Sequence, residues 1–186
     1  MAATRIAPVE PPYEPEVEEI LKRWTPGGYD VDPPAIFRLY QRHPELASRL
    51  RPLGGYVLGH ALIGDRAREL VILRTTARAG AEYEWGVHAA TLARDAGLTA
   101  EQIAATAKGT AGDPAFDERD SLIIALCDEL HDTATVSDGL WSTLAEHWDD
   151  RELLELVVIV GWYRLHSYVL NAARLELEPW GERFPK

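Results

Sequence analysis

Three side chains in the middle of the sequence are of the types that transfer protons, and their spacing suggests that they share one site. Glu84 and His88 lie four residues apart in the stretch EYEWGVHAATLARDAG, residues 82–97. If this stretch is helical, the two side chains lie on one face and can hydrogen-bond. Glu69 precedes them in an apolar segment, RELVIL, where an unpaired carboxylate would be costly. These residue types could carry out general acid–base chemistry, and a purely structural histidine–glutamate pair is the alternative.

The neighbours of this pair favour a sheltered site over a solvated ion pair. Trp85 and Tyr83 flank it and are expected to form the wall of a substrate pocket. Apolar surroundings raise the pKa of a carboxyl group and lower that of an imidazole, because they favour the uncharged form of each group. The alternatives are structural. The histidine could be a core residue bonded to its carboxylate neighbour, and Glu69 could pair with Arg66 or Arg68.

Other polar residues give weaker signals. His60 follows a glycine-containing segment, GGYVLGHAL, and is a candidate substrate-binding residue, although a loop or packing role is the simpler interpretation. Arg74 and Arg78 could anchor a substrate carboxylate, or could be surface charges. His166 lies in a long apolar segment near the C-terminus, where interface packing is a better interpretation than a cavity wall. No third ligand accompanies the glutamate–histidine pair, so neither a metal nor another cofactor is expected.

The elements that position these residues are expected to be helices. Apolar residues recur at helical spacing between residues 16 and 178, and we find no alternating β-branched runs bounded by hairpin turns. One helix is predicted to begin at an acidic cap, Asp65, and to end at Gly80. The link to the next helix is short, so these two helices should be antiparallel neighbours. Thr99 and Gln102 have the spacing of a capping box. The predicted fold class is all-α.

The chain divides into one domain and two terminal segments. Residues 1–15, rich in proline and glutamate, are interpreted as a flexible arm or an extended strap, and residues 179–186 as a C-terminal tail. Within the helical domain, residues 16–178, Pro52 and the adjacent glycines predict a kink or break. Residues 149–177 are apolar on most faces, which is typical of a central or interface helix. We therefore expect self-association into a homo-oligomer.

Composition argues against several classes of partner. The chain has 186 residues and a formal net charge of −11, with 46% hydrophobic and 26% charged residues, which is typical of a soluble single domain. The negative charge argues against nucleic acid and anionic membranes. The longest apolar run, LVVIVGWY, is too short to span a bilayer, and no signal peptide is evident. A small-molecule substrate and a cytoplasmic location are the expectation.

The segment RELVILRTTARAGAEYEWGVHAATLARDAGLTAEQIAA resembles the core of the carboxymuconolactone decarboxylase family, which includes the alkylhydroperoxidase D-like (AhpD-like) proteins. The resemblance covers residues 35–178 and implies an all-α fold that forms trimers or hexamers. In the peroxidase members, a C-x-x-C-x-x-x-H helix is paired with a glutamate from the preceding helix. His88 and Glu69 match that histidine and that glutamate, but Ala81 and Glu84 stand at the two cysteine positions.

The absence of both cysteines distinguishes between the two functions that the resemblance implies, peroxide reduction and decarboxylation. Peroxide reduction in that branch needs two thiols, and the single cysteine, Cys127, lies in another apolar segment. The decarboxylase branch resembles this chain in keeping a glutamate four residues before its histidine. It implies a cofactor-free lyase that acts on a small cyclic or lactone acid. In that case His88 supplies the proton, Glu84 tunes its pKa, and Glu69 relays protons or orients the substrate. The alternatives are an AhpD-like peroxidase and a non-catalytic helical assembly that binds a small ligand.

Overall fold

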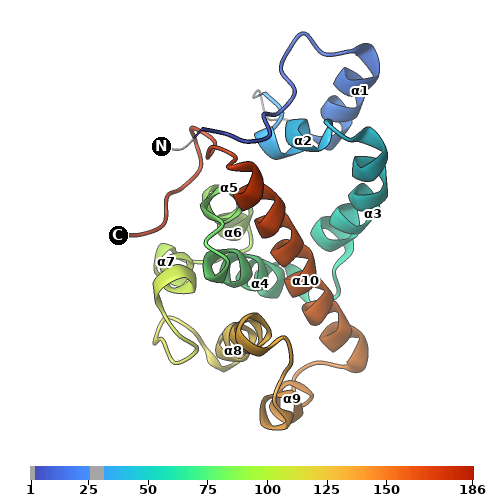
Figure 1. Cartoon of the computed structure of the whole chain (residues 1–186). Coiled ribbons are helices and arrows are strands. Elements are labelled where there is room, and N and C mark those ends of the chain that lie inside the picture. Colours follow the sequence, from blue (N-terminus) through green and yellow to red (C-terminus); the bar gives the residue numbers. More distant parts are fainter. Residues whose placement is uncertain (1–2, 26–31) are drawn as a thin grey trace.

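The structure is a computed structural model that describes residues 3–25 and 32–186, and within these ranges the regular elements are helices (Figure 1). The all-α fold class predicted from the sequence is confirmed. In chain order the helices are α1 Pro15–Trp24, α2 Ala35–Tyr40, α3 Pro44–His60, α4 Gly64–Arg78, α5 Glu82–Ala90, α6 Leu92–Asp95, α7 Ala100–Lys108, α8 Glu118–Thr133, α9 Asp138–Leu144 and α10 Asp150–Ala173.

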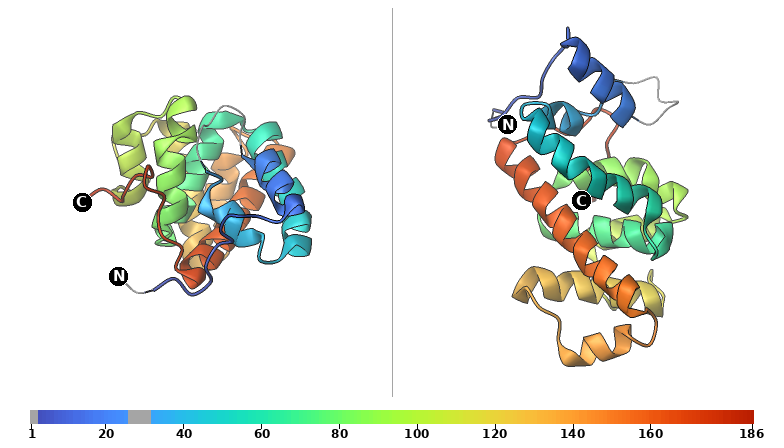
Figure 2. Two further views of the ribbon diagram at one scale, coloured as in Figure 1. Left: turned by 90° about the horizontal axis from the view of Figure 1, so that it is seen from above. Right: turned by 90° about the vertical axis from the view of Figure 1, so that its right-hand side faces the viewer.

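Two helices, α4 and α10, form the centre of the fold. α4 contacts α5, α7, α8 and α10, and every residue of α4 from Arg68 to Thr76 is buried. α10 runs past α4, with α1 and α2 toward one of its ends, α3 alongside it, and α8 and α9 toward the other end (Figures 1 and 2). The main core lies between these layers and includes Leu70, Ile72, Trp85, Ile124 and Leu156. A charged residue on the buried part of α4 must therefore find its partners inside the protein.

The start of α4 differs from the prediction. Asp65 is not the cap: Ile63 occupies that position, and its side chain makes no capping hydrogen bond. Instead Glu155 of α10 accepts hydrogen bonds from the backbone N–H groups of Leu62 and Ile63, at 2.7 and 3.0 Å. A carboxylate there satisfies unpaired N–H groups and interacts favourably with the helix dipole. The predicted end is confirmed, since Gly80 follows the helix with a left-handed φ of +62°.

The break predicted inside α3 is absent. The helix continues through Pro52 and ends only at His60. Val57 is completely buried, and the indole ring of Trp162 on α10 lies next to Gly54, where a larger side chain would begin to crowd it. Packing against the centre of the fold therefore outweighs the weak helical preference of this segment, as is common for helices in proteins.

The helix that carries Glu84 and His88 is shorter than predicted. α5 ends at Ala90, Thr91 has non-helical dihedrals, and α6 follows, whereas the sequence predicted one helix up to Gly97. The Thr91 hydroxyl donates a hydrogen bond to the Val87 carbonyl at 2.7 Å, a contact that often bends helices. α4 and α5 are neighbours, as the short link predicted.

The described part of the N-terminal arm is extended alongside α2. Arg38 donates a hydrogen bond to the carbonyl of Val9 at 3.2 Å, and Arg42 donates to the carbonyl of Ala7 at 2.8 Å. Residues 1–2 of the arm lie outside the described ranges. The structure thus has a strap over the helices at this point, and the flexibility of the arm stays a prediction.

By length and composition alone, α10 is the one helix among the described residues that could cross a membrane. Its longest continuous apolar run is shorter than the 24-residue helix. Within the fold, 56% of the apolar window is buried, and a mostly buried core helix passes the same test of length and composition. We therefore describe α10 as a core helix.

Candidate active site

A buried imidazole–carboxylate pair lies at the centre of the candidate site. His88 Nδ1 is 2.7 Å from Glu69 Oε2, and the two residues are 4% and 0% exposed. A carboxylate only accepts hydrogen bonds, so the hydrogen lies on Nδ1, and His88 donates it to Glu69. This contact fixes the ring and leaves Nε2 for other partners. The pair joins α4 to α5, so the packing of these two helices sets its geometry.

The second oxygen of Glu69 is also bound. Arg68 Nε donates to Glu69 Oε1 at 2.9 Å, and Arg68 in turn pairs with Asp65 at 2.5 Å. Of the two arginines considered for Glu69, Arg68 is the partner, whereas Arg66 pairs with Asp120. Glu69 therefore forms both contacts that the sequence suggested: one oxygen pairs with an arginine, and the other accepts the hydrogen bond of His88. The guanidinium compensates the buried carboxylate, which would otherwise be costly.

Glu84 lies on the opposite side of the imidazole but does not hydrogen-bond to it. His88 Nε2 is 3.8 Å from Glu84 Oε1, so the i,i+4 pair shares a face without the predicted bond. The role of holding the ring belongs to Glu69 instead. Burial raises the pKa of Glu84, an effect that His88 reduces and that the Glu69 charge reinforces. Glu84 is therefore biased toward a protonated carboxyl group, which can donate a hydrogen bond or a proton.

The pKa of His88 moves in the direction opposite to the one predicted. Burial alone would lower it, but the charge and the hydrogen bond of Glu69 outweigh burial, and the pKa of His88 is raised. The apolar neighbours alone predicted the opposite direction, because they do not include the Glu69 carboxylate from the preceding helix. A raised pKa favours the imidazolium, the form that can donate a proton from Nε2.

Aromatic residues and a second histidine from other helices surround the pair. Tyr163 of α10 packs edge-on against His88, with ring centroids 5.3 Å apart, and also contacts the ring of His166. The Tyr40 hydroxyl is 3.5 Å from His166 Nδ1, and no described residue bonds His166 Nε2, which is buried. Burial and the nearby His88 lower the pKa of His166 to about 4, so it is neutral at pH 7.

Sequence reasoning missed Tyr40 and Tyr163 and placed His166 in an interface. A signal was present for α10: Tyr163, His166 and Ser167 recur at helical spacing in an otherwise apolar segment, so they share a face. No comparable signal marked Tyr40. It reaches the site because the short helix α2 is packed beside the C-terminal half of α10 (Figure 1), a long-range contact that spacing does not reveal.

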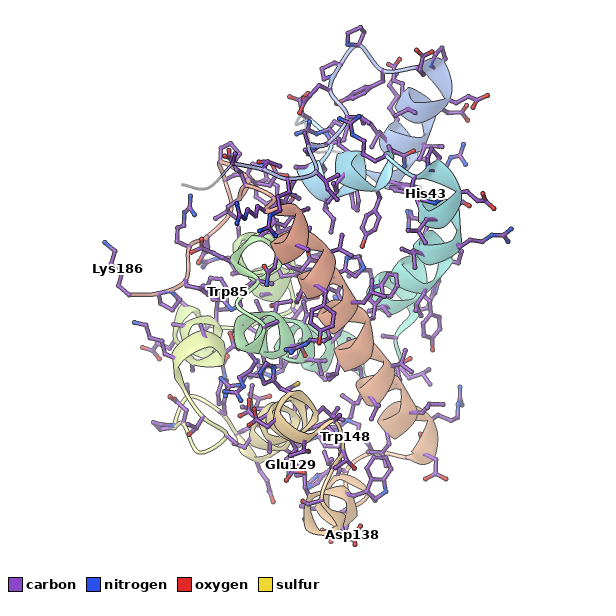
Figure 3. All side chains as sticks on the ribbon, viewed as in Figure 1. His43, Trp85, Glu129, Asp138, Trp148 and Lys186 are labelled. Carbon is purple, nitrogen blue, oxygen red and sulfur yellow. The ribbon has the colours of Figure 1, made fainter. Side chains whose placement is uncertain are left out.

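Trp85 and Tyr83, the predicted pocket-wall residues, form hydrogen bonds with residues outside the Glu69–His88 pair. Trp85, labelled in Figure 3, donates its indole N–H to the Thr106 hydroxyl at 3.0 Å within the core. The Tyr83 hydroxyl donates to Glu178 at 2.6 Å. His60 is exposed at the end of α3. Glu69, Glu84 and His88 are therefore brought together, and a substrate contact by these three other residues stays a prediction.

Neither of the arginines considered as anchors faces the pair. Arg74 is buried and donates two hydrogen bonds of 2.7 Å to Asp128. Arg78 pairs with Asp128 and Asp132. Both tie α4 to α8, so they serve packing rather than substrate binding. Of the arginines discussed, Arg68 alone contacts the site.

Cys127 has the character of an inert thiol. It is 1% exposed on α8, and its nearest polar contacts are the Thr75 hydroxyl at 3.8 Å and the Val71 carbonyl at 3.9 Å. Burial raises its pKa to about 12, so the reactive thiolate is not populated at neutral pH. The chain offers no second thiol with which Cys127 could form a disulfide, because the sequence contains no other cysteine.

Comparison with known proteins finds a family match for part of the sequence. The model of the carboxymuconolactone decarboxylase family matches residues 44–123, a segment that contains Glu69, Glu84 and His88. No match was found among curated proteins.

Two solved structures share the fold. One is an Agrobacterium tumefaciens protein, described as of unknown function and as a proposed antioxidant defence protein AhpD. It has a TM-score of 0.68 and 20% identity, over 75% of this chain and 94% of its own. The other, an uncharacterized peroxidase-related protein from Silicibacter sp. TM1040, has a TM-score of 0.81 and 13% identity, over 100% and 99%. At such identities the likeness concerns the fold.

Proposed function

We propose that this chain, which belongs to the carboxymuconolactone decarboxylase family, is a cofactor-free lyase that decarboxylates a small cyclic or lactone acid. One observation carries the proposal. The buried His88 ring is held by Glu69 at 2.7 Å through Nδ1, while its Nε2 faces Glu84 at 3.8 Å. Two acid–base groups thus lie side by side, and a substrate atom that takes the place of the Glu84 carboxyl group next to Nε2 could be protonated there.

The proposed reaction needs one proton and no redox partner. When the bond to the departing carboxylate breaks, its electron pair moves into the conjugated carbonyl group, and carbon dioxide leaves. The resulting enolate takes a proton on carbon from His88 Nε2–H. Glu69 stabilises the imidazolium before this step and keeps the ring oriented. Glu84, whose pKa burial raises, can return the proton to His88 and recover one from solvent.

Burial of the pair supports this chemistry. Glu69, Glu84 and His88 are each at most 6% exposed, which strengthens their electrostatic interactions and keeps water from competing for the enolate. A substrate can reach the pair only if surrounding side chains move apart. Tyr40 and His166 come from different helices and meet over a long contact of 3.5 Å, so this part of the wall is held by few polar interactions.

A thiol peroxidase is the second candidate, because the structural neighbours carry antioxidant or peroxidase descriptions. The site argues against it. Ala81 and Glu84 stand where the family resemblance places the two cysteines, and Cys127 is buried on another helix with a pKa raised to about 12. Peroxide reduction of that type needs an accessible thiolate.

The test is carbon dioxide release from carboxymuconolactone and other small lactone acids, with His88→Gln as the variant. Glutamine keeps a polar side chain but cannot donate the proton, so we expect a loss of at least about 10²-fold. His147→Gln is the matched control, since His147 lies between α9 and α10 and the hydrogen bond that it accepts from Arg119 uses its backbone carbonyl, not its imidazole.

Two results would contradict the proposal. One is full activity in a His88→Gln protein whose circular dichroism shows it to be folded. The other is the absence of carbon dioxide release by the wild type from every lactone acid offered. Peroxide consumption with a thiol donor, abolished when Cys127 is blocked, would instead support the peroxidase.

A further inference from the structure

A polar cavity lies between α4, α8 and α10. Its volume is about 250 Å³, the space of roughly eight water molecules. Polar groups from all three helices line it: Thr75, His131, Arg164 and Tyr168. Leu130 and Val160 supply apolar wall. A charged group beside apolar wall is the usual composition of a small-molecule site.

Arg164 is the charged group of this cavity, and no carboxylate neutralises it among the described residues. Its Nε donates to the Tyr168 hydroxyl at 3.0 Å, and its Nη1 donates to His131 Nδ1 at 2.5 Å. Both partners are neutral acceptors. The half-buried guanidinium also lies over the Tyr168 ring, 5.0 Å from its centroid. None of these contacts supplies a negative charge, and the two hydrogen bonds use Nε and Nη1 but not Nη2.

The surrounding charges do not cancel this one. Asp128 and Asp132 of α8 are the acids whose charges act on His131, and both are engaged by Arg74 and Arg78. These two arginines and two aspartates sum to zero, so the positive charge of Arg164 is left over. Burial, Arg164 and Arg78 lower the pKa of His131, as expected beside positive charge.

From this geometry we propose that the α4–α8–α10 cavity binds a small organic anion, with its carboxylate on Arg164 and its apolar part against Leu130 and Val160. His131 accepts from Arg164 through Nδ1, which places its own hydrogen on Nε2 as a further donor. The Tyr168 side chain is 60% exposed, so one side of the cavity is open to solvent.

This cavity is separate from the His88 site. Thr75 follows Glu69 by six residues on α4, which at 100° per residue turns the two side chains roughly 120° apart. On α10, Arg164 follows Tyr163 of the His88 site, and neighbouring residues of a helix do not face the same way. The proposal therefore does not depend on the chemistry at His88.

Calorimetric titration with benzoate at low salt tests the proposal, because benzoate joins a carboxylate to a flat apolar ring. We expect saturable binding with a dissociation constant on the order of 1 mM, given the few atoms of the probe. Arg164→Gln should weaken binding at least tenfold, and Arg164→Lys should weaken it less, since lysine keeps the charge but loses the planar fork. Benzamide, the uncharged analogue, should bind at least tenfold more weakly to the wild type.

Two controls locate the site. Arg151→Gln removes the same charge from an exposed position on the same helix and should leave the affinity unchanged. His88→Gln should also leave it unchanged, and a loss there would assign benzoate to the other site and overturn the proposal. Equal binding of benzoate and benzamide, or undiminished binding by Arg164→Lys and Arg164→Gln, would overturn it too. If Arg164→Gln does not fold, the lysine variant and the benzamide comparison decide.

Discussion

At the scale of single residues, spacing identified the reactive groups but not their contacts. The i,i+4 spacing correctly placed Glu84 and His88 on one helical face, yet the short hydrogen bond of His88 goes to Glu69 on the neighbouring helix. A contact within one helix follows from periodicity. A contact between helices depends on how they pack, and the predicted pKa of His88 had the wrong direction because that contact was not foreseen.

Replacing Glu69 by glutamine should lower the pKa of His88. The carboxylate is what raises this pKa against the effect of burial, and an amide of the same shape removes the charge while it can still hydrogen-bond. Titration of His88 by NMR in the wild type and in Glu69→Gln measures the change. Glu82→Gln, which alters a carboxylate that pairs with Arg183, is the control and should not move it. An equal or higher pKa in Glu69→Gln would contradict the assigned role.

His166 should make the protein less stable as the solution becomes acidic. Its pKa is about 4 in the fold and about 6.5 in an unfolded chain, so below pH 6.5 the unfolded state binds the proton more readily. Stability is therefore lost as the pH falls from 6.5 toward 4, by about 2 kcal/mol at pH 5. Urea unfolding at pH 7.5 and pH 5 measures this, and His166→Phe should reduce the difference between the two. An unchanged difference would show that His166 is not the group responsible.

At the scale of elements, local signals predicted the helical content and some of the helix ends correctly, and other helix ends wrongly. The capping box of Thr99 and Gln102 and the glycine end of α4 are present as predicted, because both depend on residues close in sequence. The start of α4 is capped by Glu155, more than ninety residues away, and the uninterrupted α3 is held by packing. Neither the capping by Glu155 nor the continuity of α3 can be predicted from residues that are close in sequence. The same holds for the candidate site. Tyr40, Tyr163 and His166 come from α2 and α10, which are distant in sequence from α4 and α5, so local patterns did not place them there.

The C-terminal tail depends on the absence of a side chain on α5. Glu182 donates its backbone N–H to the Gly86 carbonyl at 3.0 Å, and a Cβ atom on Gly86 would lie 2.1 Å from the Glu182 carbonyl oxygen. Gly86→Ala should therefore displace the tail and lower the free energy of unfolding by roughly 1–3 kcal/mol. The matched control is Gly59→Ala in α3, where the added atom meets nothing within 4 Å and should stabilise the helix by about 0.5–1 kcal/mol. Urea unfolding measures both, and equal effects would contradict the tail contact.

At the scale of the whole molecule, α10 presents a second apolar face that the monomer leaves exposed. Leu154, Val158 and Leu165 are 65%, 40% and 39% exposed, and their spacing of four and seven residues places them along one side of the helix. The opposite side packs on α4. A helix that is apolar all round is usually buried on all sides. The sequence pattern predicted a central or interface helix, and this distribution is compatible with both roles at once.

The exposed face leads us to expect that the protein associates with copies of itself. A contiguous apolar strip of this kind is rare on monomers and common at interfaces. Sedimentation equilibrium at micromolar concentration should therefore give a mass that is a multiple of the 20.7 kDa chain. Leu154→Glu, which puts a charge at the most exposed point of the strip, should shift the equilibrium toward the monomer. Ile6→Glu adds the same charge at a 52% exposed apolar residue in the arm and should not. A wild type that sediments as a single chain would show that the strip is not an interface between copies, and the long apolar helix would then be explained by its packing on α4 alone.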